Sequence, residues 1–336
     1  MGSGGRSKPK AHERLVLREL ALPSAALSFH EDVAQGLART PKSIPPKYFY
    51  DATGSDLFER ITDTPEYYPT RKEAELLEAH GDTIVEDAGL PEAVVELGSG
   101  SARKTRLLLR RLLLDGRTVE YVPIDISAAA ITDLSDHLLA EYPHLRINAL
   151  IGDYHAGLAA MAQRRDTRKL FLFLGSSLGN YNLPEARALL KLVRDAMGPN
   201  DRFLLGLDQI KEPAVLHAAY NDAAGVTAAF NVNLLTRINA ELGGRFDVSR
   251  FQHVAFYNVA EHRIEMHLES TMDQTVRIDA LDRSFVFRKG ERLHTENSYK
   301  YNLARLTQLV DGLGLRIDRH WSDSLGWFSE SLLAPV

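Results

Sequence analysis

Five short apolar runs in the middle of the chain alternate with longer segments whose apolar residues recur at helical spacing. The runs lie near residues 93–97, 119–125, 146–152, 169–174 and 202–208. Between them stand stretches such as RKTRLLLRRLLLD and LPEARALLKLVRDAM, which present one apolar face when they are helical. This alternation predicts an α/β fold with a mainly parallel sheet that is covered by helices on both faces.

The flanking segments have other patterns. Residues 13–45 and 71–89 have helical spacing, and residues 212–243 are predicted to form long helices. Apolar and polar residues then alternate from 250 to 290, which predicts antiparallel strands. The C-terminal stretch from LARLTQLVDGLGL onward predicts a helix and a hairpin that adds two strands, at least one of them antiparallel, to the sheet edge.

These patterns predict two domains. Residues 71–210 and 300–336 form the α/β domain, and residues 13–70 and 211–299 form a second domain from both sides of it. The first twelve residues, with MGSGGRSKPK at their start, are rich in Gly, Ser and Lys. We expect them to be a disordered tail or a tag.

Composition excludes several classes of function. The net charge of −5 and the pI near 6.2 argue against a nucleic-acid partner. The absence of cysteine excludes disulfides, thiolate zinc sites and a cysteine nucleophile. No apolar run approaches the roughly 18 residues of a membrane span, and no secretory signal is visible. We therefore expect a cytoplasmic protein without a membrane partner, and we expect it to be a monomer.

A glycine-rich loop follows the first of the five strands, in VVELGSGSARKT. Gly98 and Gly100 let the backbone turn tightly and come close to a ligand. The dinucleotide fingerprint requires a small residue three positions after Gly100, where this chain has Arg103, and no Gly-Lys-Ser/Thr of a P-loop follows. The loop alone is therefore weak evidence for a nucleotide-like ligand.

Acidic residues at the ends of successive strands strengthen this evidence. Glu96 ends the first strand, Asp125 ends the second and Asp153 follows the third, with the ring of Tyr154 beside it. In a parallel sheet these ends meet at one edge, where Asp125 could bind ribose hydroxyls and Asp153 an adenine amino group. These carboxylates stand without a complete phosphate-binding motif beside them. Such a site favours the cationic S-adenosylmethionine over NAD or ATP, whose phosphates are negatively charged. The alternative is that each acid is an ordinary loop residue.

The segment RLHTENSYKY, residues 292–301, carries a second signal. If it is a strand, Glu296 and Ser298 project from the same face, because strand side chains alternate with period 2. Such a pair is most often part of a solvated strand face, but it can also read the side chain of a ligand.

Several longer motifs together resemble the histidine Nα-methyltransferases of ergothioneine biosynthesis. They are PKSIPPKYFYDATGSDLFERITDTPEYYPTR, VELGSGSARKTR, FLGSSLGN, AYNDAAGVTAAFN, RIEMHL and TENS. The resemblance spans roughly residues 30–335 and implies a Rossmann-like methyltransferase domain with a second, α+β substrate-binding domain. It also implies transfer of three methyl groups from S-adenosylmethionine to the α-amino group of L-histidine, which gives the betaine hercynine.

The resemblance assigns site residues one by one. Cofactor positions, to which Gly100 of the loop is added, are Tyr50, Gly98, Lys104, Asp125, Asp153 and Tyr154. Positions near the amino acid are Tyr67, Gly175, Asn180, Tyr220, Met266, Glu296 and Ser298. Tyr50 and Tyr67 are the candidate catalytic residues, because their hydroxyls can orient the reacting amine. Asn180 and Tyr220 would hold the carboxylate, whereas Met266, Glu296 and Ser298 would lie near the side chain.

Plainer interpretations exist for these residues. Tyrosines in YFYD and EYYP are often half-buried core residues, and Asn180 suits a turn after Gly179. Tyr154 departs from the family, where phenylalanine is usual, but the ring is kept. The histidines at 253, 262, 267 and 294 have no metal-ligand spacing, so we expect no metal.

Two rival functions remain. The first is Nα-methylation of another aromatic amino acid such as tryptophan, for which smaller and less acidic residues than Met266 and Glu296 are expected. The second is a non-catalytic S-adenosylmethionine-binding protein, in which the residues on the substrate side are expected to have decayed.

Overall fold

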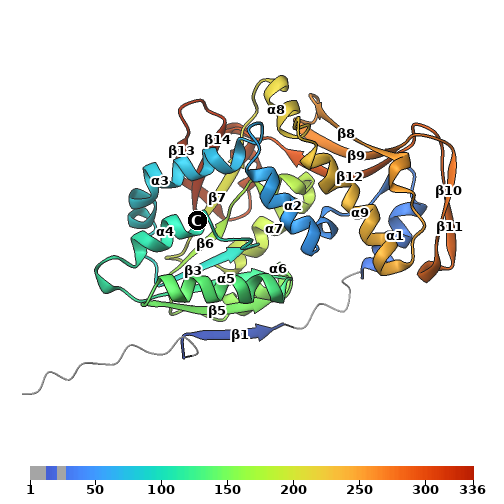
Figure 1. Cartoon of the computed structure of the whole chain (residues 1–336). Coiled ribbons are helices and arrows are strands. Elements are labelled where there is room, and N and C mark those ends of the chain that lie inside the picture. The colour runs from blue at the N-terminus through green and yellow to red at the C-terminus, as the bar shows by residue number, and fades with distance from the viewer. Residues whose placement is uncertain (1–12, 21–27) are drawn as a thin grey trace, which may run out of the picture.

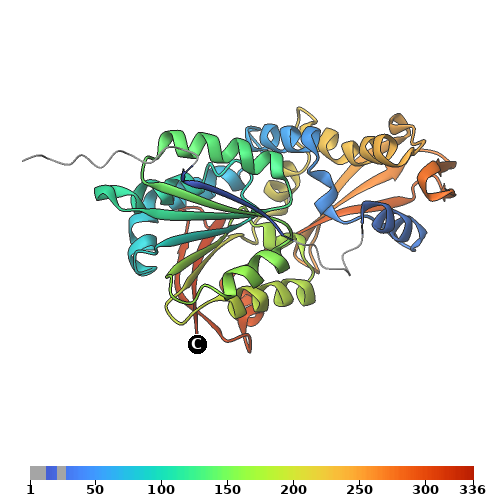
Figure 2. The ribbon, with the colours of Figure 1, turned by 90° about the horizontal axis from the view of Figure 1, so that it is seen from below.

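The computed structural model describes residues 13–20 and 28–336, which form two packed parts (Figure 1). One part is built on an eight-stranded sheet, and the other on a four-stranded sheet and a two-stranded hairpin. Figure 2 shows helices on both sides of the larger sheet, with the hairpin at the far end of the second part. Residues 1–12, for which we predicted a disordered tail or a tag, lie outside the described residues.

The larger sheet has the strand order β1-β5-β4-β3-β6-β7-β14-β13. Its bounds are β1 Leu15–Glu19, β3 Ala93–Leu97, β4 Val119–Asp125, β5 Leu145–Ile151, β6 Lys169–Phe173, β7 Arg202–Asp208, β13 Leu315–Ser322 and β14 Phe328–Pro335. All neighbours from β1 to β7 pair in parallel, whereas β14 pairs antiparallel with both β7 and β13. The predicted α/β sheet and its C-terminal hairpin are confirmed.

Helices cover both faces of this sheet, as the apolar spacing predicts. One face packs against α3 Pro69–Asp87, α4 Thr105–Leu112 and α5 Ala128–Glu141. The other packs against α6 Tyr154–Ala162, α7 Leu183–Ala196 and α10 Leu303–Val310. Within the described ranges, no helix has the length and apolar character that a membrane crossing requires.

The predicted helix over residues 13–45 is wrong. Its first described segment is the edge strand β1, which pairs in parallel with β5. Among the described residues of this range, an α-helix forms only over α1 Phe29–Ala38, before the short strand β2 Lys42–Ser43. The Arg14 guanidinium donates to the carbonyls of Tyr142, Leu145 and Leu139, and these bonds hold the segment against the larger sheet. Residues 13–20 therefore belong with this sheet and not, as we predicted, with the substrate-binding domain.

The second part consists of a sheet in the order β2-β12-β9-β8 and of helices packed on it. Its elements are α2 Ala52–Thr62, α8 Pro213–Ala219, α9 Val226–Leu242, β8 Phe251–Asn258, β9 Arg263–Ser270 and β12 Arg292–Tyr299, and the hairpin is β10 Gln274–Ile278 and β11 Arg283–Phe287. The antiparallel pairing of β8 with β9 and of β10 with β11 is as predicted for residues 250–290, and β12, which lies beyond that range, also pairs antiparallel with β9. The long helices are also confirmed, with a break after α8 that leaves Tyr220 at the end of that helix.

Short 3-10 helices connect these elements. They are η2 Pro46–Phe49, η3 Leu114–Gly116, η4 Ser177–Asn180, η5 Val248–Arg250 and η6 Asp279–Leu281. The two sheets are joined just beyond β12, where the Tyr301 N–H donates to the Asp208 carbonyl and the Ile210 N–H donates to the Tyr301 carbonyl. The end of β12 is thus fixed beside the end of β7.

The contact between η4 and β12 depends on a residue without a side chain. A Cβ on Gly179 would lie 2.9 Å from the backbone oxygen of Tyr299 and 3.2 Å from its nitrogen. We expect Gly179→Ala to lower the free energy of unfolding by about 1–3 kcal/mol, because backbone must move to admit the methyl group. Urea unfolding measures this change.

The matched control is Gly198→Ala. The nearest atom to its Cβ would be an Asp201 side-chain oxygen at 3.5 Å, which is an ordinary contact. This variant is expected to remain within about 0.5 kcal/mol of the parent. Equal effects of the two substitutions would show that the close approach at Gly179 is not needed.

Candidate active site

A cavity of about 610 Å³, including its open mouth, lies where the two parts meet. The seven residues that we predicted near the substrate all line it, and so does Tyr50, which we predicted as a cofactor-binding and catalytic residue; the seven are Tyr67, Gly175, Asn180, Tyr220, Met266, Glu296 and Ser298. They come from segments far apart in the sequence, including η4 of the larger part and β9 and β12 of the second part. The fold therefore brings the substrate-side residues together in one place.

Aromatic rings form one wall of this cavity. The Tyr50 ring lies 5.7 Å from that of Phe58 and 5.8 Å from that of Phe230, both edge-on. Tyr67 continues the wall, 6.3 Å from Phe58 and 6.3 Å from Tyr220. These edge-to-face contacts hold the rings in place, so that the two candidate catalytic hydroxyls have defined positions.

Glu296 and Ser298 lie on the same face of β12, as the alternation predicts, and both are buried. Met266 faces Glu296 across the β9–β12 ladder. Burial raises the pKa of Glu296 to about 7, and the Lys300 ammonium opposes this rise. Among the described residues, no group hydrogen-bonds to the Glu296 carboxylate. This carboxylate is therefore available to accept a hydrogen bond from a ligand.

Tyr220 is held at both ends. Its hydroxyl donates to Ser298 Oγ at 2.7 Å, and its carbonyl lies 2.9 Å from Nε2 of His253. Burial raises the pKa of Tyr220 well above its ordinary value, and the nearby Glu296 adds to the effect. Burial likewise raises the pKa of Tyr67, with Tyr220 and Glu296 adding to the rise. Both phenols are therefore protonated near neutral pH and can act as hydrogen-bond donors.

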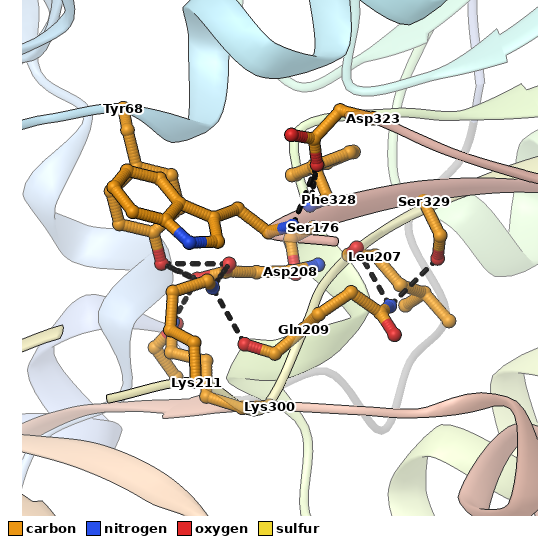
Figure 3. A network of polar contacts seen from close by, with 12 residues as sticks. Tyr68, Ser176, Leu207, Asp208, Gln209, Lys211, Lys300, Asp323, Phe328 and Ser329 are labelled. Atoms are coloured by element: carbon orange, nitrogen blue, oxygen red, sulfur yellow. Dashed lines mark hydrogen bonds and ion pairs between the residues drawn. The ribbon is translucent and has the colours of Figure 1, made fainter. Parts of the chain in front are cut away.

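A buried ion-pair network stands at the end of β7, and its central residue, Asp208, lines the cavity (Figure 3). The Asp208 carboxylate pairs with the Lys300 ammonium at 2.7 Å and also with Lys211. The Tyr68 hydroxyl donates to both Asp208 oxygens, at 2.7 and 2.8 Å. Burial alone would raise the pKa of Asp208, but the two lysines hold it below its usual range. The carboxylate therefore stays ionised.

Sequence reasoning missed this network, although two signals were present. Lys300 continues the period-2 series that begins with Glu296 and Ser298, so its side chain belongs to the same strand face. Asp208 ends β7 as Asp125 ends β4. A lysine near a polar strand end resembles a solvated residue, and only the structure shows that its exposed fraction is 0%.

Apart from Tyr50, which lines the cavity, and Lys104, which precedes α4, the predicted cofactor residues gather at the carboxyl ends of β3, β4 and β5, which are neighbours in the sheet. Gly98 and Gly100 have positive φ values of 73° and 47°, and a Cβ on Gly100 would meet no atom within 4 Å. The backbone there faces open space, as close approach to a ligand requires. Asp125 ends β4, and one of its oxygens accepts the Ser127 N–H at 3.0 Å. This arrangement fits an adenosine-type ligand.

Asp153 and Tyr154 begin α6. One Asp153 oxygen caps this helix by accepting the Ala156 N–H at 2.8 Å. The Tyr154 ring packs edge-on against Phe173 at 5.8 Å, and its hydroxyl would lie 2.7 Å from a Cβ on Gly98. The extra hydroxyl of this chain therefore lies beside the glycine loop. These residues do not line the cavity described above.

Lys104 connects the cofactor side with the cavity. It pairs with the fully buried Glu73, which also accepts the N–H of Gly175 at 2.7 Å. Glu330 lies next to this pair and is fully buried, and burial and Glu73 raise its pKa well above the ordinary value. The cavity loop and the predicted cofactor residue thus share one carboxylate, which sequence reasoning also missed.

The histidines that we set aside have other contacts. His253 contacts the Tyr220 carbonyl and Asn231, His267 stacks on Phe256, and His262 contacts Tyr257. No group of three or more His, Cys, Asp or Glu side chains in the described ranges could hold a metal ion. The absence of a metal remains a prediction.

Comparison with known proteins identifies the family. Residues 29–335 match the family model described as histidine-specific methyltransferase, S-adenosylmethionine-dependent. The chain is 43% identical to the histidine N-alpha-methyltransferase of Mycobacterium tuberculosis over 319 residues, which cover 95% of this chain and 98% of that protein.

Two further relatives are more distant. Ergothioneine biosynthesis protein 1 of Neurospora crassa is 31% identical over 84% of this chain, a match that covers 32% of that longer protein. The 4-dimethylallyltryptophan N-methyltransferase of Claviceps purpurea is 26% identical over 88% of this chain and 92% of its own length. The family model covers residues 29–335, and these include every residue that lines the cavity. This chain therefore belongs to the histidine-specific, S-adenosylmethionine-dependent methyltransferases.

Proposed function

We propose that this chain catalyses the Nα-trimethylation of L-histidine to hercynine with S-adenosylmethionine as methyl donor, the first step of ergothioneine biosynthesis. The observation that carries the proposal is one cavity that joins the side-chain readers Glu296 and Ser298 to the phenols of Tyr67 and Tyr220. Family membership supports both the donor and the substrate.

The side-chain end of the substrate is recognised by polarity. A neutral imidazole has one N–H donor and one bare nitrogen that accepts. The Glu296 carboxylate accepts a hydrogen bond from the ring N–H, and the Ser298 hydroxyl forms a hydrogen bond with the other ring nitrogen. Met266, opposite Glu296 on β9, packs against the ring and limits its size.

The reacting amine lies at the other end of the cavity, at the aromatic wall. The donor supplies a methyl group on a sulfonium, which is already activated toward displacement. The chain's own contribution is to hold the amine in line with that methyl group, and orientation of this kind contributes about 7–11 kcal/mol at best. The Tyr67 and Tyr50 hydroxyls orient the amine, and the faces of the rings stabilise the quaternary ammonium product.

Asn180 and Tyr220 hold the carboxylate. Asn180 ends η4, which Gly179 brings against β12, so its amide lies on the cavity wall opposite the second part. Tyr67 and Tyr220 are neighbours in the aromatic wall, 6.3 Å apart between ring centroids, and we assign the amine to Tyr67 and the carboxylate to Tyr220. Gly98, Lys104, Asp125 and the Asp153–Tyr154 pair are the proposed cofactor contacts.

The rival substrates fit less well. An indole carries one N–H and no ring acceptor, and it is larger than imidazole, whereas this chain keeps both Met266 and the acidic Glu296 beside the cavity. The relative that acts on a tryptophan derivative is also the more distant one, at 26% identity against 43%. A non-catalytic binding protein is disfavoured because every proposed substrate residue is present and in one cavity. The cytoplasmic location and the monomeric state remain predictions.

The direct test is incubation of the purified protein with S-adenosylmethionine and each of the twenty amino acids, followed by mass spectrometry. We expect a gain of three methyl groups on histidine alone. Glu296→Ala should lower histidine turnover by about tenfold or more while leaving cofactor affinity unchanged, because the lost contact is to the side chain. A preference for tryptophan, or no histidine product, would contradict the proposal.

The raised pKa of Glu296 predicts a pH dependence. As pH falls through about 7, Glu296 gains a proton and no longer accepts from the imidazole N–H, so kcat/KM for histidine should fall. In Glu296→Gln this step disappears, and the declines that remain come from protonation of the substrate's own ring and α-amino group. Steady-state profiles from pH 5.5 to 8.5 compare the two proteins. If kcat/KM falls in the same way at low pH in both proteins, Glu296 is not the group that titrates.

Stability gives an independent check on the same group. The folded pKa of about 7 exceeds the ordinary value of 4.5, so the folded state binds the proton more tightly than the unfolded chain does. The stabilisation is complete below pH 4.5 and is lost as pH rises through 7. Glu296→Gln should remove this pH-dependent component from thermal unfolding curves.

A further inference from the structure

A chain of buried polar contacts begins at the Asn231 side chain of α9, whose exposed fraction is 0%. The Asn231 amide nitrogen lies 2.9 Å from the His267 carbonyl oxygen and 2.9 Å from Nδ1 of His253. The Asn231 amide oxygen lies 2.8 Å from the hydroxyl of Thr295, which precedes Glu296 on β12. One side chain thus contacts β8, β9 and β12, which are neighbours in the four-stranded sheet.

The partners of Asn231 fix the orientation of its amide. A backbone carbonyl can only accept, so the His267 carbonyl requires the NH₂ group of Asn231 to face it. The second N–H of that group then donates to Nδ1 of His253, which must carry a lone pair. The opposite orientation would place the Asn231 oxygen against the His267 carbonyl oxygen, and two buried acceptors cannot satisfy each other.

The same reasoning fixes the proton of the His253 ring. Its other nitrogen, Nε2, lies 2.9 Å from the Tyr220 carbonyl oxygen, which can only accept. Nε2 therefore carries the proton, and the ring is the neutral Nε2–H tautomer. An imidazolium would turn a second N–H toward the NH₂ group of Asn231. Burial lowers the pKa of His253, which also favours the neutral ring.

The bond from His253 acts on the residue to which we assign the substrate carboxylate. Tyr220 directly follows α8, and the carbonyls at a helix end have no partner within the helix. His253 supplies that partner from β8. Asn221 adds a second contact, because its side-chain amide donates to the Ala255 carbonyl of the same strand at 3.2 Å. The backbone that carries the Tyr220 phenol is thus fixed to the four-stranded sheet.

We propose that His253, oriented by Asn231, is a positioning residue that places the Tyr220 hydroxyl for the substrate carboxylate. The inference rests on the proposed function, which assigns the carboxylate to Tyr220, and goes beyond it by naming the groups that hold this phenol. His253 lies outside the cavity lining and acts through Tyr220. Its effect is therefore expected at the carboxylate end of the substrate and not at the ring.

The test measures ligand affinity by calorimetry in the presence of S-adenosylhomocysteine, so that no methyl transfer interferes. The two ligands are L-histidine and histamine, which keeps the ring and the amine but has no carboxylate. The wild-type protein should bind L-histidine about tenfold or more tightly than histamine, because histamine leaves the carboxylate site without its partner. Tyr220→Phe should reduce this preference and gives the reference value for the other variants.

Two substitutions of His253 separate its ring nitrogens. The amide nitrogen of glutamine reaches the place of Nε2, so His253→Gln keeps a donor to the Tyr220 carbonyl and should retain the wild-type preference. The amide of asparagine reaches only the place of Nδ1, so His253→Asn loses that donor. We expect His253→Asn to lower the preference about fivefold, toward the Tyr220→Phe value. The double variant with Tyr220→Phe should show the same preference as Tyr220→Phe alone, because the two residues act through one contact.

His267→Asn is the matched control. His267 is also a buried histidine and lies on the neighbouring strand β9, but its ring stacks on Phe256, and only its backbone carbonyl contacts Asn231. This variant should retain the wild-type preference for L-histidine over histamine. A purely structural role for His253 would weaken both ligands by the same factor and leave the preference unchanged, and this result would overturn the proposal.

Further outcomes separate the possible failures. If His253→Asn does not fold, nitrogen NMR of the wild-type protein decides, because an Nδ1–H tautomer or an imidazolium at neutral pH contradicts the inference. Equal affinity of the wild-type protein for the two ligands would also contradict it. If His253→Asn lowers the preference but L-histidine is not methylated when S-adenosylmethionine is supplied, the proposed function fails and the role of His253 stands.

Discussion

The interaction on which the site depends is the buried ion pair between Asp208 and Lys300. Asp208 ends a strand of the larger sheet, and Lys300 follows β12 of the smaller one, so the pair lies where the two sheets are joined by backbone hydrogen bonds. Burying two charges costs several kcal/mol per ion before their mutual attraction offsets it. Here Lys211, Tyr68, Ser298 and Tyr220 satisfy the remaining hydrogen-bonding groups, so neither charge is left unpaired.

A second buried carboxylate plays a comparable part on the cofactor side. Glu73 of α3 binds Lys104, which begins the glycine-loop helix, and the N–H of Gly175 in the cavity wall. Both buried carboxylates are bound by residues at or in α3. Glu73 belongs to this helix, and Tyr68, which donates to Asp208, immediately precedes it. Asp208 and Glu73 thus fix the position of the glycine loop and of the cavity wall relative to each other. This explains how two ligands can be aligned across a boundary between two sheets.

Much of this architecture could be predicted from the sequence, because it depends on periodicity. The parallel strands are apolar runs, and Glu296 and Ser298 share a face through simple alternation. β1 could not be predicted, because LVLRE has one half-buried residue and is held by Arg14 and by pairing with β5. Lys300 and Asp208 were missed for a related reason, since charged residues at strand ends are usually solvated and only the joining of two sheets buries them.

In the proposed function, one cavity binds both ends of a histidine, with the ring at β12 and the amine at the aromatic wall. A crystal structure of the protein with L-histidine and S-adenosylhomocysteine tests it most directly. The account predicts the imidazole between the Glu296 carboxylate and the Ser298 hydroxyl, and the α-amino group beside the Tyr67 hydroxyl. Histidine bound in the reverse orientation, with its amino group at Glu296, or bound outside this cavity, would contradict it.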